Sequence, residues 1–144
     1  MRELSVFARR SEGRQAHREA YEAYIHSPAW FATRQWWFET ISVGRSMPVT
    51  CVGCEKPWRL ERDDVHHIDY TRLGNESIED LWPLCRTCHE HIHDVMAGTK
   101  SWRKLSRIQA NNLALATIRH QHGITELAGQ GVRADGVSSL RTWL

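Results

Sequence analysis

The chain has 144 residues, a formal net charge of +2 and 41% hydrophobic residues, which favours one folded domain with a modest core over a disordered chain. This mildly basic balance is compatible with a nucleic-acid partner but does not require one. No apolar run approaches the ~20 residues of a membrane span, and no apolar signal segment follows Met1. We therefore expect a cytoplasmic protein whose cysteines are reduced.

The first part of the chain predicts a tail and two helices. Residues 1–13 lack apolar periodicity and predict a flexible N-terminal tail, with a basic arm that contacts phosphate as the alternative. From Arg14 onward, apolar residues recur at helical spacing. Ser27 and Pro28 then predict the N-cap and first position of a second helix. We assign the aromatic residues of that helix to the core.

The middle of the chain predicts two strands followed by a helix. Residues 64–69 and 81–84 read as the strands, and 58–60 as a further short strand. The proline in 81–84 places that strand at a sheet edge or at its own end. A helix should begin near the last cysteine and run to about residue 96, where Gly98 stops it.

The longest helical pattern runs from about residue 100 to 120, and Gly123 supplies its stop. One face of this pattern is basic, which predicts either a solvated surface or a stripe along a phosphate backbone. The four basic residues of the stripe are Lys100, Arg103, Lys104 and Arg107. We expect residues 124–144 to pack back on the core or to meet a partner.

All four cysteines fall into two Cys-x-x-Cys pairs, Cys51 with Cys54 and Cys85 with Cys88. Each pair can chelate locally, and two pairs together close a tetrahedral zinc site. Because four thiolates leave the ion no open position, we expect this zinc to be structural. Its loss should unfold the centre of the protein.

Five histidines lie between the cysteine pairs or directly after them: His66, His67, His89, His91 and His93. On a helix, His89 and His93 share a face and His91 points away. On a regular strand, His66 and His67 face opposite sides, so they serve one site only if the strand twists or ends there. Imidazoles can hold a catalytic divalent ion that stabilises phosphate charge, and a free imidazole can act as general base.

A resemblance to the HNH endonucleases, the ββα-metal nucleases with a cysteine-bound structural zinc, rests on V-H-H-I-D-Y-T-R-L-G-N-E-S-I-E-D-L-W-P-L-C-R-T-C-H-E-H-I-H. The earlier Y-E-A-Y-I-H-S-P-A-W and C-V-G-C look like the lead-in of a bacterial HNH subgroup. The resemblance implies an α+β fold, a small ββα-metal (His-Me finger) core on a four-cysteine zinc site with flanking helices. It predicts a nuclease domain over 14–98, with its core at 51–96, and a C-terminal helical extension over 99–144.

Position by position, the resemblance implies a role for each site residue. His67 matches the general base that activates water, and His66 matches the adjacent metal ligand. His89 matches the helix ligand after the last cysteine, and His93 a further ligand used in some members. Asp80 stands where the motif usually has asparagine. We expect its carboxylate to accept hydrogen bonds from loop amides and to orient the base.

The predicted function is metal-dependent hydrolysis of DNA phosphodiester bonds, by nicking or cutting. The expected ions are Zn²⁺ at the cysteines and Mg²⁺ or Mn²⁺ at the histidines, where Ni²⁺, Co²⁺ or Zn²⁺ would also bind. The expected partner is DNA, and a homodimer through 124–144 or a larger complex is compatible with the pattern. Candidate phosphate contacts are Arg72, Arg86, Lys100, Arg103, Lys104 and Arg107.

Two alternatives belong to different functional classes. A zinc-stabilised DNA-binding module with a vestigial nuclease site predicts DNA affinity without turnover. An RNA-cleaving toxin on the same core predicts growth arrest with intact chromosomal DNA. A purely structural zinc protein would not need four histidines in this arrangement.

Overall fold

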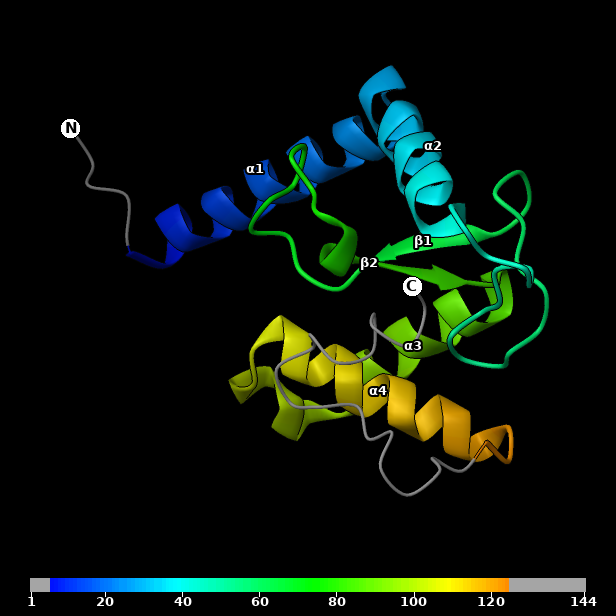
Figure 1. Cartoon of the computed structure of the whole chain (residues 1–144). Helices are drawn as coiled ribbons and strands as arrows, with labels where there is room; N and C mark the ends of the chain where they lie inside the picture. Colours follow the sequence, from blue (N-terminus) through cyan, green and yellow to red (C-terminus); the bar gives the residue numbers. More distant parts are fainter. Residues whose placement is uncertain (1–5, 125–144) are drawn as a thin grey trace.

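The computed structural model describes residues 6–124, with side chains from residue 11 onward, and over that range it is α+β (Figure 1). This confirms the predicted fold class. Its elements are α1 (Val6–Ile25), α2 (Pro28–Ser42), β1 (Asp64–His67), the 3-10 helix η1 (Ile78–Asp80), β2 (Leu81–Leu84), α3 (Arg86–Gly98), the 3-10 helix η2 (Lys100–Lys104) and α4 (Arg107–Gln121).

Strands β1 and β2 form an antiparallel hairpin in which Asp64 pairs with Leu84 and His67 with Leu81. Figure 1 shows α2 on one side of this hairpin and α3 and α4 on the other. Because side chains alternate along a strand, the hairpin contributes side chains to two separate hydrophobic cores. Leu81 packs with the α2 side, and Leu84 packs with the helices on the α3 side. The two faces of this ribbon therefore have different surroundings.

Of the two N-terminal helices, α2 begins where the sequence predicts and α1 does not. Ser27 caps α2, since its hydroxyl accepts a hydrogen bond from the Trp30 amide at 3.2 Å. Trp30 and Trp37 are buried as predicted, but Phe31 and Trp36 are 58% and 44% exposed, so the prediction that the aromatic residues of this helix lie in the core is wrong for these two. Helix α1 begins at Val6 rather than near Arg14. Part of the predicted flexible tail is thus helical, because good helix formers such as alanine, arginine and glutamate prevail despite weak apolar periodicity.

The predicted helix over 100–120 is two helices. Ser106 begins α4 with a capping box, in which its hydroxyl accepts from the Gln109 amide, and Gly123 follows the helix with a φ of +71°. The basic stripe is consequently divided between η2 and the first residue of α4. Three of its members lie on η2, namely Lys100, Arg103 and Lys104.

The strands are also shorter than predicted. β1 ends at His67, and residues 58–60 form no strand, although Thr50 and Pro57 make an isolated bridge. Among the described helices, none combines the length and apolar character needed to cross a bilayer. The prediction of a dimer contact through 124–144 falls almost wholly outside the described residues.

Candidate active site

The four cysteines converge into one cluster between the knuckle before β1 and the start of α3. Their sulfur atoms all lie within 4.8 Å of one another, and all four are free thiols. Cys54 Sγ and Cys85 Sγ are 3.8 Å apart, which matches the edge of a tetrahedron with metal–sulfur bonds of about 2.3 Å. The Gly53 amide donates to Cys51 Sγ and the Cys88 amide to Cys85 Sγ. This donor set fits a structural zinc ion.

Gly53 allows the cysteine cluster to close against α4. A Cβ at this position would lie 2.9 Å from Cys88 Sγ and 3.3 Å from Ile118 Cγ2. Such distances are too short for any larger residue without displacement of its neighbours. The glycine is therefore needed for close approach, since the knuckle, α3 and α4 meet at this point.

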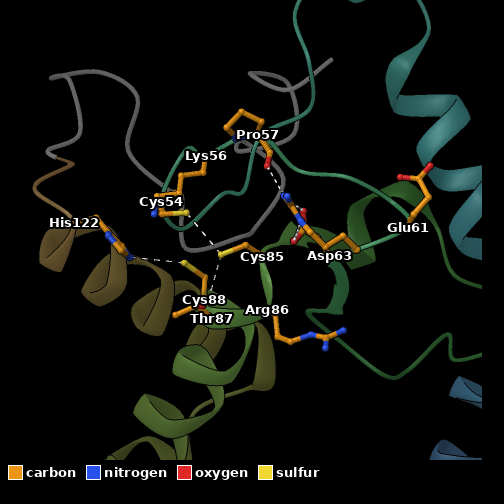
Figure 2. Close-up of a pocket in the computed structure, with 11 residues that line it drawn as sticks. Cys54, Lys56, Pro57, Glu61, Asp63, Cys85, Arg86, Thr87, Cys88 and His122 are labelled. Carbon is orange, nitrogen blue, oxygen red and sulfur yellow. Dashed lines mark hydrogen bonds and ion pairs between the residues drawn. The ribbon is translucent and has the colours of Figure 1, made fainter.

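A cavity of about 690 Å³ opens beside the cysteine cluster. Figure 2 shows Cys54, Cys85 and Cys88 gathered on its wall, with the His122 ring directed toward Cys88. His122 Nε2 lies 3.8 Å from Cys88 Sγ. Arg86 also lines the cavity, so one of the predicted phosphate contacts lies near the cysteine cluster.

A second cluster forms from His66 on β1 and His89 and His93 on α3. One ring nitrogen from each lies within 4.8 Å of the others, and the Nε2 atoms of His89 and His93 are 3.2 Å apart. The three ring centroids are 4.9 to 5.2 Å from one another. The two helix side chains at positions i and i+4 and the strand side chain thus converge on one point. Three imidazoles would leave further coordination positions on an ion open.

Two of the three histidines in this cluster, His66 and His93, have lowered pKa values that favour neutral rings. Desolvation and the neighbouring His89 lower the pKa of His93 to about 4. Burial holds the pKa of His66 well below its usual range. Neutral imidazole is the form that binds a metal ion, so both rings are ready to act as ligands at neutral pH.

Two side chains that the sequence analysis did not single out contact the rings of this cluster. Asp64 Oδ2 lies 3.1 Å from His89 Nδ1, and Asn111 Oδ1 lies 2.6 Å from His66 Nε2. Asp64 stands two residues before His66, on the same strand face, which is a signal that sequence alone could have given. Asn111 lies on α4 and carries no such signal.

His67 lies on the opposite face of the hairpin from His66. Its ring stacks on Trp30 at a centroid distance of 4.5 Å and also contacts Tyr21 and Tyr70. The side chain is 2% exposed. Burial lowers the pKa of His67, although the nearby Glu76 carboxylate opposes that shift. The ring is thus neutral and enclosed by aromatic side chains.

Glu76, another residue that the sequence analysis missed, holds the His67 ring. His67 Nε2 lies 2.9 Å from Glu76 Oε1, which also accepts from the Gly74 amide, and Tyr24 donates to the other oxygen. Burial alone would raise the pKa of Glu76, but the hydrogen bonds it accepts hold the pKa below its usual range. Because an ionised carboxylate only accepts, Nε2 carries the ring hydrogen.

Asp80 performs only the first of the two tasks predicted for it. Its carboxylate accepts from the Ser77 amide at 2.9 Å, as expected for a group that orders the loop. It also pairs with Arg72, with nitrogen–oxygen distances of 2.6 and 2.9 Å. The carboxylate that contacts the His67 ring belongs to Glu76. The prediction that Asp80 orients the base is therefore not supported by a contact.

The predicted phosphate contacts are not brought into one patch. Arg72 is engaged by Asp80, and Arg107 donates to the Tyr70 hydroxyl at 2.6 Å while its guanidinium lies 4.0 Å from the Tyr70 ring centroid. Arg86, Lys100, Arg103 and Lys104 are exposed, and Arg72 is exposed as well despite its ion pair with Asp80.

Comparison with known proteins gives one match. Residues 51–95 match the family model described as HNH endonuclease. This segment contains both cysteine pairs, the histidine cluster and His67, but not α4. No curated protein and no solved structure matches the chain. The matched segment also carries the cysteine cluster and the antiparallel hairpin, so the family match and the structure agree over residues 51–95.

Proposed function

We propose that the protein is a metal-dependent endonuclease that hydrolyses DNA phosphodiester bonds. In this proposal His66, His89 and His93 bind the catalytic ion, and His67 is the general base. The observation that carries the proposal is the convergence of three imidazoles, with ring nitrogens within 4.8 Å, inside the segment that matches the nuclease family. The family match points to nuclease activity in broad terms, and the roles of individual residues are the proposal.

His67 has the protonation state that a general base needs. It is neutral, and Glu76 keeps the hydrogen on Nε2, so the lone pair is on Nδ1. Nδ1 can therefore take the proton from the attacking water, and the Glu76 carboxylate then stabilises the imidazolium. A divalent ion at the histidine cluster supplies electrostatic stabilisation of the charge on the phosphate and on the leaving 3′ oxygen.

The two clusters should hold different ions. We propose Zn²⁺ at the cysteines, because four thiolates are its preferred structural set. At the histidines we propose Mg²⁺ or Mn²⁺, while imidazole ligands also admit Ni²⁺, Co²⁺ or Zn²⁺. Exposed basic side chains, such as Arg86 beside the cysteine cluster and Arg103 on η2, would contact the DNA backbone. The nuclease domain would span 14–98, with 99–144 as its helical extension.

Plasmid nicking tests this proposal directly. Purified protein is incubated with supercoiled DNA and Mg²⁺, Mn²⁺, Ni²⁺ or EDTA, beside His67→Ala. His91→Ala is the matched control, because His91 lies on α3 outside the histidine cluster. We expect metal-dependent nicking that is lost in His67→Ala, with zinc content and unfolding midpoint retained, and kept in His91→Ala. Equal activity of the folded His67→Ala variant would contradict the assigned base.

A DNA-binding module without turnover is the second candidate, and one observation favours it. His67 is 2% exposed beneath Tyr21, Trp30 and Tyr70, so a water reaches the ring only if these side chains shift when DNA binds. Retained DNA affinity with no cleavage under any of the ions would select this candidate.

A further inference from the structure

The buried side chain of Asn111 connects helix α4 to the histidine cluster. Asn111 is fully buried (0% exposed), and its partner His66 is 1% exposed. The two residues are joined by the 2.6 Å contact between Asn111 Oδ1 and His66 Nε2. Asn111 lies outside the segment that matches the nuclease family, so nothing in the family motif assigns it a role.

The orientation of the Asn111 amide follows from its other contacts. Its Nδ2 group donates to the backbone oxygen of Ile68 at 2.9 Å and to that of Arg107 at 3.0 Å. Both amide hydrogens are therefore used, and a flipped amide would place its oxygen against two carbonyl oxygens. The atom that faces His66 must be the oxygen, which can only accept a hydrogen bond. His66 Nε2 consequently carries the ring hydrogen.

The distance also argues against Asn111 as a direct metal ligand. Two ligands of one ion at right angles, each about 2.1 Å from the ion, lie about 3 Å apart. The His89 and His93 Nε2 atoms, at 3.2 Å, fit that separation. The 2.6 Å between Asn111 and His66 is shorter and is that of a strong hydrogen bond.

We propose that Asn111 is a positioning residue that fixes His66 as the Nε2–H tautomer and so makes Nδ1 of His66 the atom that binds the ion. This inference rests on the proposed role of His66 as a metal ligand. On the helix side, His89 Nδ1 contacts Asp64, and Nε2 of His89 faces Nε2 of His93 at 3.2 Å. An ion at this cluster would thus be held through Nδ1 of His66 from the strand and through Nε2 of His89 from the helix, and α4 would support the site through Asn111.

The tautomer of His66 can be measured in the unmodified protein. Long-range ¹H–¹⁵N correlation of the imidazole nitrogens is recorded on the full chain with its cysteine site loaded with zinc. The His66 signals are assigned by comparison with His66→Gln. We expect a protonated Nε2 and an unprotonated Nδ1 whose resonance moves when Mg²⁺ is added. A hydrogen on Nδ1, or a response to Mg²⁺ at Nε2, overturns the proposal whatever the cleavage activity is.

Metal affinity gives a second test with a matched control on the same helix. Asn112 is the neighbouring buried asparagine, and no hydrogen-bond partner of its side chain is found within the described residues. Binding of Mn²⁺ is measured by calorimetry for Asn111→Ala and Asn112→Ala. We expect Asn111→Ala to weaken binding roughly 10- to 100-fold, as for other residues that orient metal-bound histidines, and Asn112→Ala to leave it unchanged.

The outcomes separate this inference from the proposed function. If wild type binds Mn²⁺ and cleaves DNA, and Asn111→Ala binds Mn²⁺ equally well, the role of Asn111 is wrong and the nuclease stands. If wild type shows the expected tautomer and affinity loss but never cleaves DNA, the nuclease proposal fails and the role of Asn111 stands. Should Asn111→Ala fail to fold, the tautomer in wild type decides.

Discussion

The cysteine cluster and the histidine cluster lie on the same hairpin and helix. They differ in how far along the sequence the residues lie that support their ligands. The cysteines come in two local pairs, and amides within each pair donate to the sulfur atoms. The histidines come from β1 and α3, and the ring of His66 is held by Asn111 on α4. A closed site can therefore be assembled from short motifs, whereas an open site needs supports from elements far apart in the sequence.

The two clusters also differ in what their loss should do. Four thiolates around one ion carry folding free energy, because the unfolded chain has no such site. The three histidines gather on a scaffold that already has two hydrophobic cores. We expect removal of a cysteine to break the fold and removal of a histidine to break only metal binding.

The largest effect is expected from Cys88→Ser. Cys88 is buried in the core that contains Ile92 and Ile118, and a hydroxyl is a poor substitute for a zinc thiolate. Loss of zinc should abolish the cooperative thermal transition. Zinc content by atomic absorption and circular dichroism melting check this. A variant that melts like wild type without zinc would show that the cluster is not structural.

His89→Ala should keep the fold and lose the ion at the histidine cluster. The side chain is partly exposed and is one of the three proposed ligands, so we expect Mn²⁺ affinity to fall at least roughly tenfold while the melting midpoint changes little. Calorimetry and melting on the same preparation check both statements. If His89→Ala also lost its melting transition, as expected for Cys88→Ser, the two clusters would not differ in their contribution to the fold.

Glu76→Gln should slow cleavage without weakening metal binding. The neutral amide keeps the shape but removes the charge that stabilises protonated His67, so we expect a cleavage rate at least about tenfold lower. Glu79→Gln is the matched control, because Glu79 is an exposed acidic residue of the nearby 3-10 helix η1. Unchanged cleavage by Glu76→Gln would mean that the base is not held by this carboxylate.

The smallest effect is expected from Gly53→Ala, which probes the closeness of the cysteine cluster to α4. The added Cβ would meet Cys88 Sγ at 2.9 Å, and overpacking of this kind costs about 1–3 kcal/mol. Gly98→Ala is the control, since a Cβ there meets nothing within 4 Å. Urea unfolding of both variants measures the difference, and equal stability would contradict the tight packing.

The sequence predicted the parts of the molecule that depend on local patterns. Cysteine spacing located the cluster, Ser27 and Pro28 located the start of α2, and residues 81–84 were a strand as predicted. The break between η2 and α4 was also readable, because Ser106 and Gln109 have capping-box spacing. That signal was outweighed by the apolar periodicity on either side of it.

The remaining parts depend on contacts that no local pattern reveals. Asn111 and His66 are 45 residues apart in the chain, and asparagine in a helix has no spacing rule that points to a distant histidine. Glu76 lies in the loop just before η1 and Glu79 lies within η1, and only the tertiary fold buries Glu76 against His67. Which of them holds the base could not be predicted without the tertiary structure.

Helix α4 is anchored at both ends of the site. Near its C-terminus Arg119 donates to the Val52 backbone at 2.7 Å and Ile118 packs against Gly53, while near its N-terminus Asn111 holds His66. Excision of residues 51–95 as a minimal nuclease would keep every proposed metal ligand but would remove these three contacts from α4. The transplantable unit of this protein therefore extends at least to residue 121.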